Sequence, residues 1–94
     1  MKTVIKEEVI LIDLKKIDRS HHLQILDKIK SLNDFPNSSG VKLLKGLGSK
    51  IFRLRSGDFR ILFSLNSQQK QITVFAISDR RTIYKQLDKF TKRS

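Results

Sequence analysis

RLRSGDFRILF, from Arg53 to Phe63, is the stretch that decides the fold of this chain. Apolar residues alternate with other residues on both sides of Ser56-Gly57-Asp58, which is typical of a β-hairpin. Successive side chains of a strand point to opposite faces, so the apolar residues of both strands are expected to face the core together. The same parity places three arginines on the other face of the hairpin, namely Arg53, Arg55 and Arg60.

The chain before the hairpin predicts one short strand, over 2–5, followed by two helices and a loop over 33–40. The first helix is expected over 7–17, where apolar residues have helical spacing. These residues are Val9, Ile10, Leu14 and Ile17. The second helix is expected over 21–32, where apolar residues recur every three positions along one face. They are Leu23, Leu26, Ile29 and Leu32, with Ile25 beside them.

The chain after the hairpin predicts a turn over 66–70, a strand over 72–77 and a basic tail over 79–94 that contains a short helix. The strand over 72–77 is apolar at nearly every position, as expected where both faces of a strand are buried inside a sheet. Helices followed by strands indicate an α+β domain, with the helices packed on one face of a mainly antiparallel sheet.

Length and composition narrow the class of protein. With 94 residues the chain is expected to form one domain, 1–94. It has no cysteine, so disulfides and thiolate metal sites are excluded. The apolar run from Val9 to Ile12 is too short for a signal-peptide core or a membrane span. The chain is therefore expected to be soluble and cytoplasmic, with no membrane partner.

Positive charge is concentrated in the second part of the chain. The net charge is +11, yet residues 1–34 hold seven Lys or Arg against six Asp or Glu. Residues 35–94 hold thirteen basic residues against three acidic ones. Such a field attracts polyanions, chiefly nucleic acid. Four lysines near the arginines are therefore candidates for contacts with an RNA backbone. They are Lys42, Lys45, Lys50 and Lys85.

Four short motifs make this sequence resemble the RelE/ParE superfamily of toxins. They are Leu44-Lys45-Gly46, Phe52-Arg53-Leu54-Arg55, Gly57-Asp58-Phe59-Arg60 and Arg80-Arg81-Thr82-Ile83-Tyr84. The RelE branch of that superfamily implies a ribosome-dependent mRNA endoribonuclease, or mRNA interferase, that blocks translation. In many relatives a histidine precedes the arginine pair, where this chain has Asp79. Phe52 and Phe59 stand where relatives have tyrosine or tryptophan.

The resemblance implies a catalytic site of six residues. They are Arg53, Arg55, Arg60, Arg80, Arg81 and Tyr84. RNA supplies its own nucleophile, the 2′-hydroxyl, so the expected reaction needs neither a metal nor another cofactor. Arginines suit two-pronged contacts with phosphate. We expect Tyr84 to act as the base, and Arg80 or Arg81 to act at the leaving oxygen. His21 and His22 are interpreted as ordinary surface residues.

The same resemblance implies the partners and leaves alternatives. The expected partners are an acidic, RelB-like antitoxin in a hetero-oligomer, and mRNA in the A site of the ribosome. One alternative is a ParE-like toxin that acts on DNA gyrase without nuclease activity. Another is an RNA-binding module whose arginines hold RNA but do not cut it.

Overall fold

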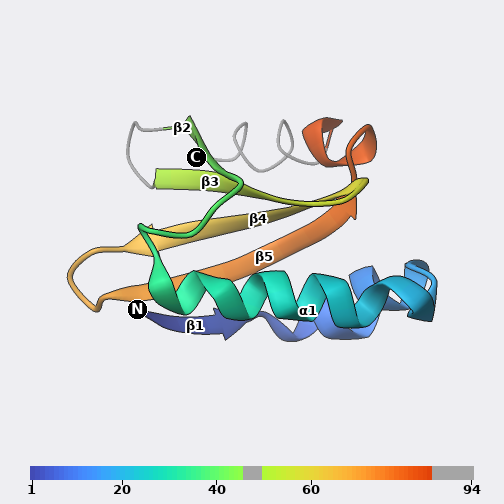
Figure 1. The fold of residues 1–94 in the computed structure, drawn as a ribbon, viewed down its shortest axis with the longest axis horizontal. Coiled ribbons are helices and arrows are strands. Elements are labelled where there is room, and N and C mark those ends of the chain that lie inside the picture. The colour runs from blue at the N-terminus through green and yellow to red at the C-terminus, as the bar shows by residue number, and fades with distance from the viewer. Residues whose placement is uncertain (46–49, 86–94) are drawn as a thin grey trace.

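A five-stranded β-sheet forms the centre of the computed structural model, which describes residues 1–45 and 50–85 (Figure 1). The strands lie in the order β1-β5-β4-β3-β2. β1 pairs with β5 in parallel, and the other neighbouring pairs are antiparallel. The strands are β1 (Lys2–Ile5), β2 (Val41–Lys45), β3 (Lys50–Ser56), β4 (Phe59–Asn66) and β5 (Gln71–Asp79). The predicted α+β class and mainly antiparallel sheet are confirmed.

The predicted hairpin is β3 and β4, and its parity is as expected. Gly57 and Asp58 form the two-residue connection, and Gly57 has φ of +58°, a backbone conformation that glycine adopts without a steric penalty. Leu54, Ile61 and Phe63 are fully buried in the main core. The rings of Phe52 and Phe63 stack with centroids 5.2 Å apart. One face of the hairpin therefore packs against the helical segments and lines the hydrophobic core.

The first helical segment is more tightly tied to the sheet than the prediction implies. It consists of a π-helix (Val9–Asp13) and a 3₁₀-helix (Leu14–Lys16). Val9 and Leu14 are both buried and lie five residues apart, which is the spacing that a π-turn brings to one side. The side chain of Asp13 accepts a hydrogen bond from the Ile77 backbone N–H at 2.9 Å. The segment thus joins the far end of β5 through a side chain as well as through packing.

The second helix, α1 (His22–Lys30), buries only part of the face that was predicted. Short 3₁₀ segments flank it at Arg19–His21 and Ser31–Asp34. Ile25 and Ile29 are buried, whereas Leu23 is 71% exposed and Leu26 is 41% exposed. A repeat of three residues drifts around a helix of 3.6 residues per turn, so Leu23 and Leu26 leave the face that Ile29 occupies. The predicted three-residue stripe is wrong at these two leucines.

β2 is not predicted by the sequence pattern, because Val41–Lys45 is short, carries two lysines and is followed by glycines. It pairs with β3 and forms one edge of the sheet. A register shift between Leu43 and Lys45 interrupts the pairing. The extra strand widens the hairpin face and places Lys42 directly opposite Arg53.

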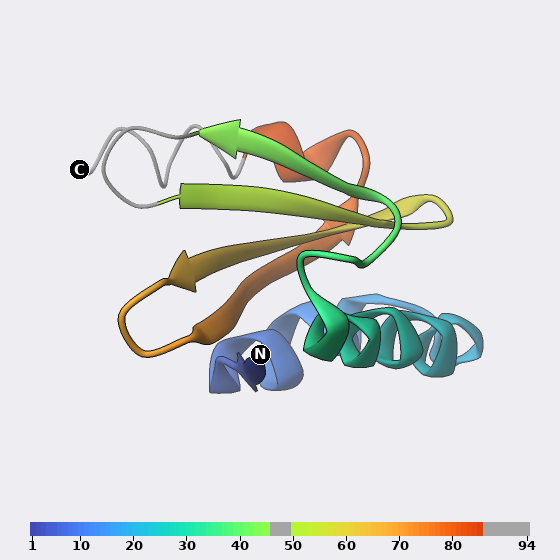
Figure 2. The ribbon, with the colours of Figure 1, turned by 60° about the vertical axis from the view of Figure 1, so that its left-hand side comes forward.

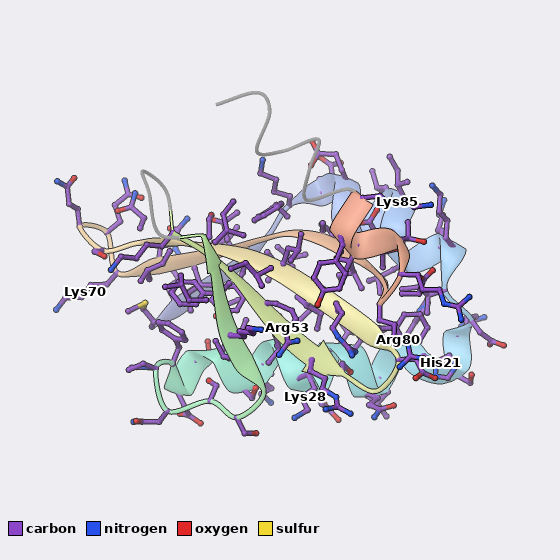
Figure 3. The ribbon with its side chains drawn as sticks, turned by 90° about the horizontal axis from the view of Figure 1, so that it is seen from above. His21, Lys28, Arg53, Lys70, Arg80 and Lys85 are labelled. Carbon is purple, nitrogen blue, oxygen red and sulfur yellow. The ribbon has the colours of Figure 1, made fainter. Side chains whose placement is uncertain are left out.

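The arginine face of the sheet is partly covered, which the sequence analysis did not predict. Residues 82–85 are helical and lie on the side of the sheet away from α1 (Figures 2 and 3). Ile83 is fully buried there in a second, smaller apolar cluster with Leu62 and Ala76. The short helix expected in the tail is therefore observed in part. Residues 86–94 of the predicted tail lie outside the described residues.

Candidate functional site

Four basic side chains lie together on the face of the sheet opposite α1. We call this group, Lys42, Arg53, Arg55 and Arg60, the basic surface. The strand register places Lys42 opposite Arg53 and Arg55 opposite Arg60. Arg55 and Lys42 are exposed, and the other two are half-buried. Figure 3 labels Arg53, which lies far from Lys70 at the end of the β4–β5 turn.

The basic surface is electrostatically unfavourable on its own. Like charges directly opposite one another on neighbouring strands destabilise a sheet. Within residues 1–45 and 50–85, no carboxylate forms an ion pair with any of the four side chains. Natural surfaces usually intersperse charges of both signs. The missing counter-charge is therefore the feature that makes this face the candidate functional site.

The guanidinium group of Arg60 is held in place by the hairpin turn. Its Nη1 donates to the carbonyl oxygen of Gly57 at 2.8 Å and to that of Phe59 at 3.0 Å. The Nε of Arg60 and the Nε of Arg53 are buried and have no hydrogen-bond partner among the described residues. A side chain that is already restrained loses less conformational entropy when it binds a ligand. Arg60 is thus a prepositioned cation.

The C-terminal turn is anchored at the same end of the sheet. The Arg80 backbone N–H donates to the carbonyl oxygen of Asp58, in the hairpin turn, at 3.0 Å. Ser78, two residues earlier, lies opposite Arg60. Tyr84 follows the buried Ile83 and is 44% exposed. The backbone of the Arg80–Tyr84 motif therefore begins beside the Arg55–Arg60 end of the basic surface.

Asp79 caps this turn. Its Oδ1 accepts from the Arg81 N–H at 2.9 Å and from the Thr82 N–H at 2.8 Å. Its Oδ2 accepts from the Thr82 hydroxyl at 3.0 Å. The Thr82 N–H, followed by the Thr82 hydroxyl, lowers the pKa of Asp79 below its usual value. The carboxylate is an N-cap of the kind that aspartate commonly provides.

The structure gathers some of the predicted site residues and separates others. Arg53, Arg55, Arg60 and Lys42 share the basic surface, while Arg80, Arg81, Tyr84 and Lys85 lie at or after the end of β5. Lys50 is paired with Leu65 and has the parity of the helix-covered face. Lys50 therefore does not join the basic surface. The side chain of Lys45, and Gly46 beside it, lie outside the described residues.

In the part of the chain that the structure describes, no three His, Cys, Asp or Glu side chains are grouped closely enough to hold a metal ion. The helices of those same residues are all too short or too polar to cross a membrane.

The fold is similar to that of RelE proteins over most of the chain. A chain in the crystal structure of an archaeal RelE–RelB complex from Pyrococcus horikoshii OT3 matches with a TM-score of 0.70 and 25% identity, over 84% of this chain and 93% of that one. The RelB–RelE antitoxin–toxin complex from Methanococcus jannaschii matches with a TM-score of 0.67 and 20% identity, over 87% and 95%. The resemblance to RelE proteins that the motifs indicate is therefore confirmed at the level of the fold.

The isolated E. coli RelE toxin shares the fold at greater sequence distance. It matches with a TM-score of 0.61 and 17% identity, over 96% of this chain and 97% of its own. No protein-family model and no curated protein sequence matches the chain. The likeness to RelE proteins therefore rests on the fold.

Two features of this chain were not predicted from its sequence. Asp79 is the cap of the C-terminal turn, a role that an aspartate three residues before a threonine indicates in retrospect. His22 is not an ordinary surface residue, because its Nε2 lies 2.7 Å from the carbonyl oxygen of Leu14 and 2.9 Å from that of Ile17. Two carbonyl acceptors require the proton on Nε2, so His22 ties α1 to the preceding helical segment. The ring of His21 packs on Phe59 with centroids 5.1 Å apart.

Proposed function

We propose that this chain is the toxin of a toxin–antitoxin pair and that it cuts mRNA in the ribosomal A site. The fold and its archaeal neighbours, which are complexes of RelE with RelB, support the toxin role. The observation that carries the nuclease role is the basic surface, in which two like-charged pairs face each other with no carboxylate among the described residues to neutralise them. An RNA phosphate supplies the missing negative charge.

The proposed reaction is an attack of the RNA 2′-hydroxyl oxygen on the adjacent phosphorus. A new bond forms between that oxygen and phosphorus, and the bond from phosphorus to the 5′-oxygen of the next nucleotide breaks. The products are a 2′,3′-cyclic phosphate and a free 5′-hydroxyl. The protein must take the proton of the 2′-hydroxyl, stabilise charge on the phosphorane and neutralise the leaving oxygen.

The residues of the site divide these tasks. Arg55 and Arg60 stabilise the phosphorane, because prepositioned donors aimed at developing charge contribute about 10²- to 10³-fold each in other enzymes. The phenolic oxygen of Tyr84 takes the proton from the 2′-hydroxyl. Arg80 or Arg81 stabilises the leaving oxygen and assists its protonation. This chain has no histidine at the position before the arginine pair, so the proton transfers do not use one there.

The partner of the toxin follows from the same charge pattern. Free toxin carries an unneutralised basic surface, so we propose a RelB-like antitoxin with an acidic segment that crosses it. The antitoxin and RNA then compete for the same side chains. The assembly is a toxin–antitoxin hetero-oligomer in the cytoplasm.

Mapping of mRNA ends in cells tests the proposed function. The wild type and an Arg60→Ala/Tyr84→Phe variant are induced briefly, and 5′ ends are mapped by primer extension. The expected result is new 5′ ends inside reading frames, phased to codons, in the wild type only. Lys70→Gln, which removes one charge far from the basic surface, serves as the matched control and is expected to cut like the wild type.

The other outcomes of this experiment identify the alternatives. Growth arrest with intact mRNA would contradict the nuclease role and favour a ParE-like action on gyrase. Intact mRNA without arrest would leave an RNA-binding module. Cutting by the Arg60→Ala/Tyr84→Phe variant at the wild-type rate would show that the nuclease does not use this site.

A further inference from the structure

A cavity of 230 Å³ lies between the first helical segment, the start of β4 and the C-terminal turn. Three parts of the chain that are distant in sequence therefore meet around it. Its polar and aromatic lining is Asp13, Lys16, Phe59, Ser78, Asp79 and Thr82. Pockets for drug-sized ligands usually measure about 300–1,000 Å³. This smaller cavity suits a single planar ring better than a whole nucleotide.

The cavity borders the reacting end of the basic surface. Ser78, in its lining, lies opposite Arg60 in the pairing of β4 and β5, and neighbouring strands are about 4.8 Å apart. Phe59, also in the lining, directly precedes Arg60 on β4 and points to the other face of the sheet. β1 pairs with β5 only as far as Val74, so the end of β5 that lines the cavity extends beyond it (Figure 1). A nucleotide with its phosphate at Arg60 can therefore reach the cavity with its base.

The two carboxylates of the lining differ in how many donors they already have. Both oxygens of Asp79 accept hydrogen bonds from the C-terminal turn. Asp13 accepts from the Ile77 N–H through Oδ2, and within residues 1–45 and 50–85 no donor is bonded to its Oδ1. Burial raises the pKa of Asp13, and the Ile77 N–H and the charge of Lys16 offset only part of that rise. Asp13 is thus the carboxylate that can accept a further hydrogen bond in the cavity.

The ligand that fits is a ring with a donor next to an acceptor. Asp13 offers an acceptor and Lys16 a donor in the same cavity, and the Phe59 ring offers an aromatic surface. Cytosine presents its N4 amino group beside the acceptor N3, and a carboxylate is a usual partner of that amino group. Unstacked bases pack on aromatic side chains. Uracil has an acceptor, O4, in place of the amino group, and adenine has two rings.

We infer, on the basis of the proposed function, that the cavity holds a cytosine base from one of the two nucleotides joined by the scissile phosphate. Oδ1 of Asp13 accepts from the N4 amino group, and Nζ of Lys16 donates to N3. The arginines hold the phosphate whatever its sequence, because phosphate contacts carry no base information. The cavity thus adds a choice of base to the proposed cleavage, made by the toxin itself.

The experiment varies the base and the cavity together. Ribosomes are programmed with mRNAs that differ only in having cytosine or uracil at the nucleotide before or after the cut. Rates of cleavage at subsaturating toxin are measured for the wild type, Asp13→Asn and Lys16→Met, after circular dichroism has shown that each is folded. Asp27→Asn removes an exposed carboxylate of α1 outside the cavity and is the matched control. Because the ribosomes are the same, a changed ratio of the two rates comes from the toxin.

A reversed preference is expected in one variant. The wild type and Asp27→Asn should cut about tenfold or more faster with cytosine than with uracil at one of the two positions, as for one good base contact. In Asp13→Asn the amide oxygen can keep the hydrogen bond from Ile77, and the amide nitrogen then donates into the cavity. That donor suits O4 of uracil, so the preference should move to uracil. Lys16→Met loses the donor to N3 and should reduce the preference for cytosine.

Two results would overturn the inference while leaving the proposed function intact. One is cleavage by the wild type at equal rates with cytosine and uracil at both positions. The other is a preference for cytosine that Asp13→Asn and Lys16→Met both keep, because the choice of base would then be made outside this cavity. A wild type that cuts none of the mRNAs would contradict the proposed function and the base site with it.

Discussion

The two faces of the same β-sheet differ in whether their side chains have favourable partners. On the face covered by α1, Leu54, Ile61 and Phe63 are fully buried against one another and against the helical segments. On the other face, Leu62 is buried beneath Ile83, but Arg55 and Arg60 are both positively charged and lie directly opposite each other. The first face stabilises the fold throughout, whereas this arginine pair on the second face opposes folding.

This difference between the faces is the reason for proposing that the functional site lies at the arginines. Local features that oppose folding are expected mainly at functional sites, because elsewhere they bring only a loss of stability. Arg55 and Arg60 could be replaced by neutral residues without disturbing the core, since their side chains point away from it. Their presence on an otherwise regular hairpin supports the proposal that a negatively charged ligand binds there. The predictions below test whether stability and activity separate by face in this way.

The largest effect is expected on the covered face, from Phe63→Ala. Phe63 is fully buried and stacks on Phe52. Its truncation should lower the free energy of unfolding by about 3–5 kcal/mol, since a cavity remains where the ring was. Urea denaturation followed by circular dichroism measures the change. Leu23→Ala, at an exposed leucine of α1, is the control and should change stability by less than about 0.5 kcal/mol. A similar loss of unfolding free energy in both variants would contradict the claim that the buried residues of the covered face stabilise the fold.

The next largest effect is expected on the basic surface, from Arg60→Gln. Cleavage of mRNA on programmed ribosomes should fall by about 10²- to 10³-fold, because a prepositioned donor to the phosphorane is lost. The free energy of unfolding should fall by only about 1–3 kcal/mol, because the hydrogen bonds from Arg60 to the carbonyl oxygens of Gly57 and Phe59 are lost as well. Rates of cleavage are compared with those of Lys70→Gln. If Arg60→Gln unfolded the protein instead, Arg60 would be needed mainly for stability, and the assignment of the basic surface to activity would be wrong at this residue.

A smaller effect is expected from the cap of the C-terminal turn. Asp79→Ala removes the acceptor of the Arg81 and Thr82 N–H groups and should lower cleavage several-fold by misplacing Tyr84. Asp79→Asn keeps an oxygen at the cap and should recover most of the rate. Single-turnover rates at saturating toxin separate this loss from a change in binding. Equal rates in Asp79→Ala and the wild type would mean that the cap does not position the reacting groups.

The same cap predicts a pH dependence of stability. Because the pKa of Asp79 is lowered in the folded protein, mainly by the Thr82 N–H, the folded state favours the ionised carboxylate. The ionised Asp79 carboxylate contributes fully to the stability of the fold above the ordinary aspartate pKa of about 3.9. This contribution is lost as the pH falls through the lowered pKa of the folded protein. Thermal unfolding of the wild type and Asp79→Asn at a series of pH values measures this. The advantage of the wild type should shrink below about pH 4, and an advantage that grew there would contradict the assignment.

The smallest expected effect is a gain in stability, from Arg55→Gln. Arg55→Gln removes one of two like charges that face each other, so the free energy of unfolding should rise by about 0.2–1 kcal/mol while cleavage falls. The melting temperature should increase by a few degrees in a domain of this size. Added salt screens exposed charges, so the gain should diminish at high ionic strength. A loss of stability in Arg55→Gln would show that the arginines are not repelling each other.

The hairpin could be predicted from the sequence because its information is local. Alternation with period two fixes which residues share a face, so the core positions of β3 and β4 and the three arginines follow from the sequence pattern alone. The turn at Gly57 and Asp58 is equally local. Lys42 is different, because its place beside Arg53 depends on β2, whose short and basic sequence carries little strand signal.

Other features depend on contacts between distant parts of the chain. Leu23 and Leu26 of α1 are apolar, but they lie off the face that packs on the sheet, and neighbouring residues do not reveal this. His22 bonds to carbonyl groups of the preceding helical segment, which a composition argument cannot detect. Ile83 packs on Leu62 and Ala76, although it lies some twenty residues after Leu62 in the sequence. The sequence therefore predicts the arginine face, and the structure adds what borders it.

Cleavage of end-labelled mRNA on programmed ribosomes, by purified wild type and by Arg55→Gln/Arg60→Gln, tests the central claim most directly. The wild type is expected to leave a 2′,3′-cyclic phosphate and a 5′-hydroxyl at one linkage. The double variant is expected to leave the mRNA intact while remaining folded, with a melting temperature no more than a few degrees below that of the wild type, because the hydrogen bonds of Arg60 to the hairpin turn are lost. A stably folded double variant that cuts as fast as the wild type would contradict the claim that the unpaired charges exist to hold the RNA phosphate.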